Sequence, residues 1–269
     1  MVPEPPGRAG GEGCRRRQRQ RQRQLRLLDS HCHLDHPLFA PDRAACLLRA
    51  REGGVASVLI PSVGAENWSA VRALSRDFGC AFGLGTHPYA LTTLAPEAQL
   101  LPDDLEGAVA IGECGLDGSI GVPWERQERV LRLHLERSKA TGLPLILHAY
   151  RCHQRLLPLL RPFAPLRGVM HSYSGGAELV AAYVDLGLHL SFGGAITWEG
   201  ARKPLESLRR VPRHRLLLES DGPDQCPRPW KGRSEPAYLP EILRVAERVR
   251  GEALAEVLGE NAHALGWLS

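Results

Sequence analysis

The chain has 269 residues, of which 43% are hydrophobic and 24% charged, as in ordinary globular proteins. This length allows one large α/β domain, and no apolar run reaches the roughly eighteen residues that a membrane-spanning helix needs. Seven cysteines, an odd number without CxxC spacing, argue against a disulfide framework. They favour free thiols in a reducing, cytoplasmic compartment.

The formal net charge of +4 is unevenly distributed. Residues 1–26 hold eight arginines against two glutamates, which gives this segment +6 and leaves −2 for the remainder. The segment is poor in apolar residues, so we predict a disordered Arg/Gln-rich tail over residues 1–24. Three interpretations are open: a solvated arm, including a start codon assigned too far upstream; an arm that attracts nucleic-acid phosphates; or a targeting peptide, although the apolar segment of a secretory signal is missing.

Eight short apolar runs follow the tail and alternate with longer segments of helical spacing. The runs cover residues 25–31, 55–63, 80–87, 107–115, 143–150, 167–173, 188–195 and 214–221. Between them lie segments such as 124–142, in which apolar residues recur three and four positions apart. Eight strand–helix repeats are typical of a (β/α)8 TIM barrel, so we predict one α/β domain of this kind over residues 25–269. The alternative, a doubly wound open sheet, usually has a Gly-rich turn where this chain has "SHCHLD".

Histidines and carboxylates recur at the ends of these runs. The C-terminal ends of all strands of a TIM barrel meet at one rim, whatever their separation in sequence. We therefore expect six candidate metal ligands to converge there: His31, His33, Glu113, His148, His171 and Asp221. One histidine at a strand end is more often a hydrogen-bonded or exposed residue than a ligand. Six such residues in register with the strands favour a metal site.

The composition of this set indicates two divalent ions. Imidazole and carboxylate groups suit Zn, Mn or Mg, and four histidines with two carboxylates exceed what one tetrahedral ion needs. Glu113, in the middle of the set, could bridge two ions about 3.5–4 Å apart and so help to activate a water. The alternative is a closed zinc site that only stiffens the barrel, but such sites favour cysteine ligands.

Six motifs in chain order carry a family resemblance: "DSHCHLD", "GTHPY", "AIGECGLD", "LPLILHAYR", "MHSYSG" and "LLLESDGPD". Through them the chain, from about residue 27 to its C-terminus, resembles the TatD-type deoxyribonucleases, metal-dependent hydrolases of the amidohydrolase-like barrel superfamily. The resemblance implies hydrolysis of DNA phosphodiesters, often from the 3′ end of single strands, by a dimetal-activated water. Single-stranded DNA or 3′ ends are then the expected substrate of a monomer that does not associate with a membrane.

The same resemblance implies a role for each candidate residue. One ion would be held by His31, His33, Glu113 and Asp221, and the second by Glu113, His148 and His171. His87 and Arg151 would contact a substrate phosphate. Asp221 and Glu113 would be the catalytic residues, with Asp221 helping to activate the attacking water.

The substrate is less constrained than the metal site. Two metal ions polarise phosphodiesters, other esters and amides alike, so a related hydrolase of small esters, amides or lactones is the alternative to a nuclease. A non-catalytic binder is a third interpretation. Aromatic and cationic residues near the rim could stack bases or contact phosphates: Tyr89, Tyr173, Trp198, Trp230, Arg151, Arg228, Lys231 and Arg233. For any single one of them, loop packing or solvation is the more ordinary role.

Overall fold

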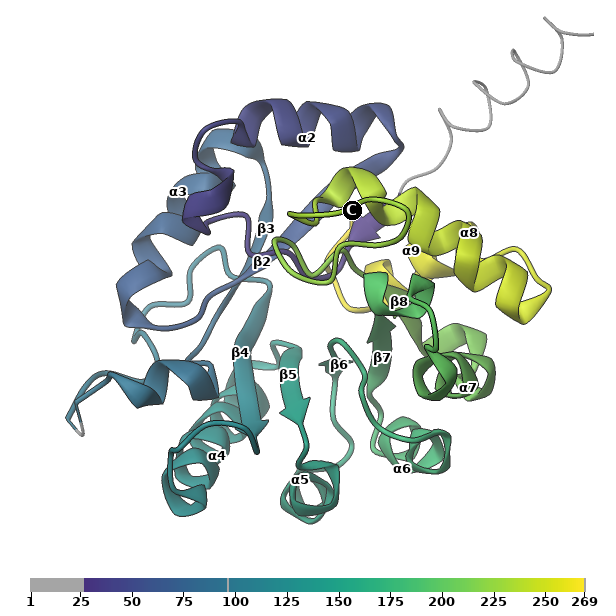
Figure 1. The fold of residues 1–269 in the computed structure, drawn as a ribbon. Helices are drawn as coiled ribbons and strands as arrows, with labels where there is room; N and C mark the ends of the chain where they lie inside the picture. Colours follow the sequence, from purple (N-terminus) through teal and green to yellow (C-terminus); the bar gives the residue numbers. More distant parts are fainter. Residues whose placement is uncertain (1–26, 96, 269) are drawn as a thin grey trace, which may run out of the picture.

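The computed structural model describes residues 27–95 and 97–268. Strands and helices alternate along these residues and form a TIM barrel, which confirms the predicted fold class (Figure 1). The predicted tail, residues 1–24, lies outside the described residues. Within the described part of the chain, no helix is both long enough and apolar enough to cross a membrane.

Eight parallel strands follow one another around the barrel in chain order. They are β1 (Leu27–Asp29), β2 (Val55–Pro61), β3 (Ala81–Leu84), β4 (Ala110–Asp117), β5 (Leu145–Tyr150), β6 (Gly168–Met170), β7 (His189–Phe192) and β8 (Leu216–Leu218). Hydrogen bonds just beyond β1 join it to β8: the Ser30 N–H donates to Leu218 O at 3.2 Å, and the Asp221 N–H donates to His31 O at 2.9 Å. The second bond places two predicted ligands side by side.

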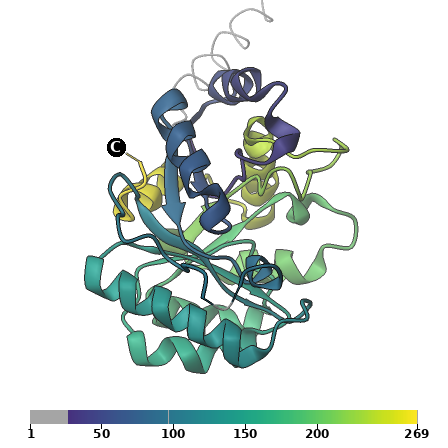
Figure 2. The ribbon, with the colours of Figure 1, turned by 90° about the vertical axis from the view of Figure 1, so that its left-hand side faces the viewer.

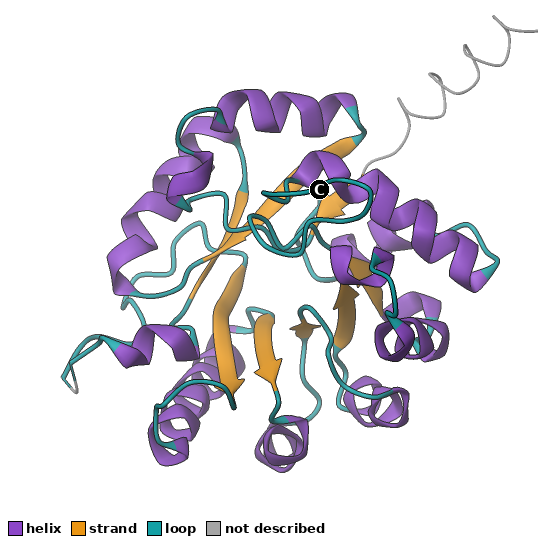
Figure 3. Cartoon of the chain, viewed as in Figure 1, coloured by secondary structure: helices purple, strands orange, loops and turns teal. Residues whose placement is uncertain are grey.

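Helices form the outer layer around the strands (Figure 3). They are α2 (Arg43–Glu52), α3 (Trp68–Phe78), α4 (Trp124–Thr141), α5 (His153–Leu160), α6 (Val180–Asp185), α7 (Arg202–Arg210), α8 (Leu239–Arg250) and α9 (Ala255–Ala264). In α4 the buried residues, among them Val130, Leu131 and Leu135, recur at helical spacing and so form one face toward the strands. Figure 2 shows this long helix on the outside of the barrel.

The N-terminal end of the barrel is filled with apolar side chains. One buried cluster joins residues of six strands to α9 and the residues after it: Leu28, Leu59, Ala110, Ile146, Val169, Leu217, Ala262, Leu265 and Trp267. The Trp267 indole N–H donates to Val109 O at 3.1 Å. Parallel strands are buried on both faces, which is why their sequences are continuous apolar runs. Buried histidines and carboxylates such as His31, Glu113 and Asp221 lie instead toward the C-terminal rim.

An irregularity at the centre of β4 determines where Glu113 lies. The strand pairs with β5 at Ile111 and again from Cys114 onward, so the regular pairing is interrupted at Gly112 and Glu113. Glu113 is the fourth of eight residues in β4, whereas the sequence analysis had placed it at the end of its strand. The Glu113 N–H donates to Ser62 O at 3.1 Å, beside β2. Bulges of this kind redirect side chains and are common beside active sites.

Gly112 is expected to be irreplaceable at this irregularity. Its φ is +141°, and a Cβ added there would lie 2.6 Å from Ile146 O. Gly112→Ala should therefore lower the free energy of unfolding by about 3 kcal/mol through strain and overpacking. Urea denaturation measures this change. Gly121→Ala is the matched control, because nothing lies within 4 Å of the added Cβ there. Equal midpoints for the two variants would contradict the prediction.

Candidate metal centre

Glu113 lies at the centre of a cluster of histidines at the C-terminal rim and is 1% exposed. Its two carboxylate oxygens face different histidines. Oε2 lies 3.3 Å from His31 Nε2 and 3.6 Å from His33 Nε2. Oε1 lies 2.8 Å from His171 Nε2 and 3.1 Å from His148 Nδ1. Oε2 therefore faces the two histidines that follow β1, whereas Oε1 faces His148 in β5 and His171 just after β6.

Asp221 and His87 complete the cluster. Asp221 Oδ1 lies 3.8 Å from His31 Nε2, and Asp221 Oδ2 accepts a hydrogen bond from the Gln225 amide. His87 Nε2 lies 3.3 Å from Glu113 Oε1. The structure thus brings together all six candidate ligands that the sequence analysis selected. It adds His87, which follows β3 by three residues and was expected to contact the substrate.

Three groups among the described residues could hold a metal ion, because the ligand atoms within each lie within 4.8 Å of one another. They are His31, His33 and Glu113; His31, His171 and Asp221; and His87, Glu113 and His148. The Oε2 atom of Glu113 is buried and has no hydrogen-bond donor among the residues that the structure describes. A buried carboxylate oxygen without a donor is costly, and a cation would satisfy it. The donor set therefore fits divalent metal.

The electrostatics of the cluster point the same way. Burial lowers the pKa of His31 and of His87 to about 4, which keeps both rings neutral. Burial by itself would raise the pKa of Glu113, but the charge of His171 and contacts with other histidines hold it well below its usual range. Burial raises the pKa of Asp221 to about 8, and neighbouring carboxylates oppose its ionisation further. The neutral His31 ring is already in the form that binds a cation, whereas contact with Glu113 raises the pKa of His171, so metal binding there would release a proton.

Two carboxylates outside the predicted set hold the rings of His148 and His171. Asp117 Oδ2 lies 3.1 Å from His148 Nε2. Glu219 Oε1 lies 3.5 Å from His171 Nδ1 and accepts the Ser172 N–H at 2.6 Å. The two histidines consequently face Glu113 with opposite ring nitrogens, Nδ1 in His148 and Nε2 in His171. Carboxylates behind ligand histidines fix the tautomer and the ring orientation.

A sequence signal for these two carboxylates existed. Side chains two or four positions apart on a strand point to the same face. Asp117 follows Glu113 by four positions in β4, so it shares the direction of a predicted ligand. Glu219 precedes Asp221 by two positions at the end of the last apolar run. Neither residue is among the six predicted ligands, because the prediction used only the ends of the runs.

Loss of either carboxylate should weaken the site without removing a ligand. We expect Asp117→Asn and Glu219→Gln each to reduce metal affinity or turnover about 10- to 100-fold, because the amide no longer fixes the histidine tautomer. Competition with a chromophoric chelator measures the affinity. Asp185→Asn, an exposed residue of α6, serves as the control. Metal affinity equal to that of the control would show that the two carboxylates do not support the ligands.

The loop after β8 is fastened to α2 by ion pairs. Arg233 Nη1 lies 2.6 Å from Asp42 Oδ1, and Arg49 Nη2 lies 2.6 Å from Glu235 Oε2. Arg233 Nη2 also contacts Glu235 Oε2 at 3.1 Å. This cluster holds the segment that leads away from Asp221. Arg233 is thereby engaged within the protein, so it is not the free phosphate partner considered from the sequence.

The structure packs Arg151 against Tyr150 and buries Tyr173. The Arg151 guanidinium carbon lies 5.1 Å from the centre of the Tyr150 ring, and the residue lines a cavity that adjoins the site. Its role as a phosphate contact stays a prediction. Tyr173 is 3% exposed and its hydroxyl donates to Gly176 O at 2.8 Å. It therefore cannot stack a base, as the sequence had allowed.

The backbone at this rim is unusual. Four residues other than glycine have positive φ within the described residues: Arg151 (55°), Ser172 (42°), Asp221 (51°) and Gln225 (51°). All four lie at or just beyond the C-terminal ends of β5, β6 and β8. Left-handed backbone at such residues is uncommon and clusters at functional sites.

Comparison with known proteins gives a consistent result. Residues 28–265 match the family model described as TatD related DNase. The chain is 34% identical over 252 residues to the uncharacterized metal-dependent hydrolase YjjV of Escherichia coli (strain K12), which covers 89% of this chain and 97% of that protein. It is 33% identical over 257 residues to the 3′-5′ ssDNA/RNA exonuclease TatD of Pantoea ananatis, covering 89% and 98% of the two chains.

A solved structure agrees as well. The crystal structure of the TatD homologue YjjV from Escherichia coli matches the fold with a TM-score of 0.82 at 32% identity. The match covers 90% of this chain and 98% of that one. The match of the family model covers most of the chain, and the first relatives are aligned over nearly their whole length. The resemblance inferred from the six motifs is therefore confirmed: the chain belongs to the TatD-related DNase family and is a metal-dependent hydrolase built on a TIM barrel.

Proposed function

We propose that the protein is a phosphodiesterase that uses two divalent metal ions, Zn, Mg or Mn, and degrades DNA as a 3′–5′ exonuclease. The observation that carries this proposal is the division of the Glu113 carboxylate between two pairs of histidines, with Oε2 at 3.3 Å from His31 and Oε1 at 2.8 Å from His171. A carboxylate placed in this way suits a bridge between two ions. The relatives named as 3′-5′ ssDNA/RNA exonucleases support the choice of substrate.

The proposed ligands are those assigned from the sequence. One ion would be held by His31, His33, Glu113 and Asp221, and the other by Glu113, His148 and His171. When bound, two such ions lower the pKa of a water and stabilise negative charge on the attacking and leaving oxygens of a phosphodiester.

Asp221 is proposed to accept the proton of the attacking water. The Gln225 amide donates to its Oδ2, which leaves Oδ1 directed toward the cluster, 3.8 Å from His31 Nε2. Beside a divalent cation the carboxylate would be ionised, which is the form that can accept a proton. Glu113 would fix the position of the reacting groups through its contacts with both histidine pairs.

His87 is proposed to donate a hydrogen bond to a phosphate oxygen. The Tyr89 N–H donates to His87 Nδ1 at 3.0 Å, so the neutral ring carries its proton on Nε2. That nitrogen faces the cluster as a donor, 3.3 Å from Glu113 Oε1, and a protonated nitrogen cannot coordinate metal. This tautomer therefore favours a role for His87 in contacting the substrate and not as a seventh metal ligand. Arg151 would add a second, cationic contact.

Reconstitution tests the proposed function. Metal-free protein would be loaded with Mg, Mn or Zn and offered 5′-labelled single-stranded DNA, a generic phosphodiester and a lactone. We expect stepwise shortening of the DNA from its 3′ end and hydrolysis of the generic phosphodiester, both lost when metal is withheld. Rapid turnover of the lactone without cleavage of DNA would instead favour a hydrolase of small esters, amides or lactones.

We also propose that the protein acts as a monomer in the cytoplasm. All candidate site residues come from one chain, so the site needs no second copy. The six cysteines among the described residues are free, as suits a reducing compartment. Light scattering coupled to size-exclusion chromatography tests the oligomeric state, and a mass of twice the chain would contradict the first part.

A further inference from the structure

A groove leads from the metal cluster along β5 and β6 toward α7. Its inner part, a cavity of about 460 Å³, reaches His148, His171 and Asp221. Its outer part, a cavity of about 610 Å³, is continuous with the inner one because Tyr150, Ser174 and Lys203 line both. We call the two parts together the β5–α7 groove.

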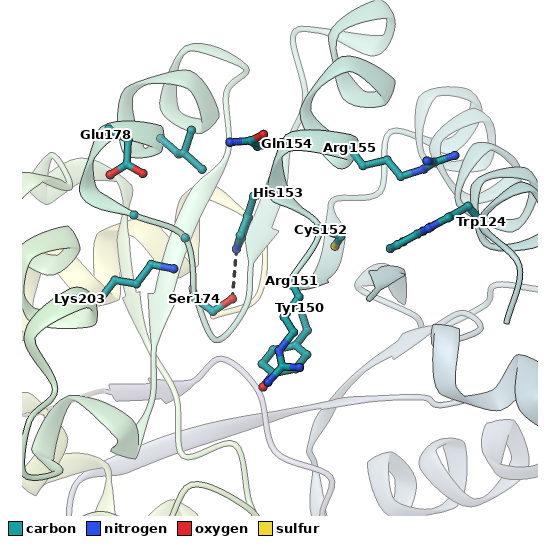
Figure 4. Close-up of a pocket in the computed structure, with 13 residues that line it drawn as sticks. Trp124, Tyr150, Arg151, Cys152, His153, Gln154, Arg155, Ser174, Glu178 and Lys203 are labelled. Carbon is teal, nitrogen blue, oxygen red and sulfur yellow. Dashed lines mark hydrogen bonds between the residues drawn. The ribbon is translucent and has the colours of Figure 1, made fainter. Parts of the chain in front are cut away.

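The lining of the β5–α7 groove is cationic. Lys203 is exposed and lines both parts, and Arg151 lines the outer part. Arg155 also lines the outer part, where it is ion-paired with Glu128. Figure 4 shows Lys203 on one side of this outer cavity and Arg155 with Trp124 on the other. Apart from Asp221 at the metal cluster, the one lining carboxylate among the described residues is Glu178. The phosphates of a nucleic-acid strand in this groove would therefore lie near cations, although the chain after residue 26 carries a net negative charge.

Two large aromatic rings are exposed along the same groove. Trp198 is 42% exposed and Tyr150 is 40% exposed. The Trp198 indole N–H donates to Cys226 O at 2.9 Å, which fixes the ring in place. The Arg151 guanidinium lies against the Tyr150 ring. Cations alternating with fixed, exposed rings are the pattern by which proteins bind single-stranded nucleic acid.

A separate cavity on the other side of the cluster has the opposite character. This cavity, of about 450 Å³, reaches His33 and His87 and shares no lining residue with the groove. Three carboxylates line it, those of Asp35, Glu66 and Asp224, without any lysine or arginine among the described lining residues. We call it the acidic cavity. Its volume suits a small ligand such as one nucleoside, and its charge would repel further phosphates.

We propose, building on the phosphodiesterase function above, that single-stranded nucleic acid lies along the β5–α7 groove and that its free end enters the acidic cavity. The scissile phosphate is then at the metal cluster, the retained strand contacts Lys203 and stacks on Trp198, and the terminal nucleoside occupies the acidic cavity. The contrast in charge across the cluster makes the site exonucleolytic, because a chain that continued beyond the cluster would bring phosphates against three carboxylates.

Binding of a non-hydrolysable strand tests the groove directly. Metal-loaded full-length protein would be titrated with a labelled phosphorothioate 12-mer and followed by fluorescence anisotropy. Lys203→Ala should weaken binding about fivefold and lower the slope of log K against log salt by about 0.7, the value for one phosphate of a single strand. Lys139→Ala, an exposed lysine near the C-terminal end of α4, should change neither. An unchanged slope in the Lys203 variant would overturn the proposed strand path.

Two substitutions of Trp198 test the proposed stacking contact. Trp198→Ala should weaken binding of the 12-mer about 5- to 100-fold, whereas Trp198→Phe should keep most of the affinity because it retains a ring for stacking. If the hydrogen bond to Cys226 were all that mattered, both variants would lose affinity equally. Equal losses would therefore count against stacking on Trp198.

Cleavage experiments test where the chain ends and separate this proposal from the nuclease function. Linear single strands should be shortened, closed circular single strands should resist, and Glu66→Lys should speed attack on a 3′-phosphorylated strand. Comparable cutting of circles would overturn the assignment of the acidic cavity. Lys139→Ala, outside the groove, should leave hydrolysis of a nitrophenyl ester of thymidine 5′-phosphate unchanged. If the wild-type protein hydrolyses neither this ester nor DNA with any metal, the proposed function fails, whereas the anisotropy results decide the groove independently.

Discussion

Replacing Glu113 by glutamine is expected to abolish nearly all turnover and to lower the metal content. The two oxygens of Glu113 lie 3.3 Å from His31 and 2.8 Å from His171, so one substitution removes the charge that both proposed ions share. A metal ion stabilises the transition state by several kcal/mol. Loss of part of this stabilisation corresponds to about a 1,000-fold fall in kcat. Turnover of a generic phosphodiester and elemental analysis of metal per chain measure the two effects.

The experiment needs evidence that the barrel is still folded. Glutamine has nearly the same volume as glutamate, so the far-ultraviolet circular dichroism of the variant should match that of the wild type. Glu256→Gln, an exposed glutamate of α9, is the matched control at the opposite end of the barrel. If Glu113→Gln keeps two metals per chain and normal turnover, the bridge between the ions is a different group.

Replacing Asp221 by asparagine is expected to reduce kcat about 1,000-fold. An asparagine cannot accept the proton of the attacking water, and general base catalysis commonly contributes about 10²- to 10⁴-fold. The amide fits the same space and the left-handed backbone at this position, where φ is 51°, because asparagine tolerates that conformation. Steady-state kinetics on a small phosphodiester should show kcat and kcat/KM falling together, the sign of an interaction made in the transition state.

Metal analysis distinguishes the two roles assigned to Asp221. If it acts mainly as the base, the variant keeps both ions while kcat collapses. If it acts mainly as a ligand, one ion is lost and excess metal restores part of the activity. A variant with normal kcat would exclude both roles.

Much of the fold and site could be predicted because, in a TIM barrel, the position of a residue along its strand determines which end of the barrel it occupies. Eight apolar runs with helical segments between them specify the topology, and this topology gathers the C-terminal ends of the strands at one rim. His31, His148 and Asp221 are far apart in sequence, yet the repeat alone was enough to expect them together. The structure confirms the barrel and brings the six candidates into one cluster.

The missed features depend on side-chain geometry that the repeat does not encode. Strand β4 continues four residues past Glu113, and its pairing with β5 is interrupted at Gly112; a regular strand pattern indicates neither feature. The ion pair between Arg233 and Asp42 joins segments that have no repeat relation, so Arg233 could not be told from a free cation. The choice of Nδ1 by His148 follows from the contact of its Nε2 with Asp117, which depends on the pairing register of β4 and β5.

The left-handed backbone at the rim has a consequence for the evolution and engineering of heat resistance. At Ser172 and Gln225, with φ of 42° and 51°, a residue with a Cβ costs about 1 kcal/mol relative to glycine. Both side chains nevertheless belong to the site, since the Gln225 amide donates to Ser172 Oγ and to Asp221. Glycine at either position would relax the backbone, but at 225 it would remove the hydrogen bond to Asp221 and at 172 the hydroxyl that the Gln225 amide contacts. Selection for a higher melting temperature alone would therefore favour substitutions here that erode catalysis, so thermostable variants should be sought on the helices instead.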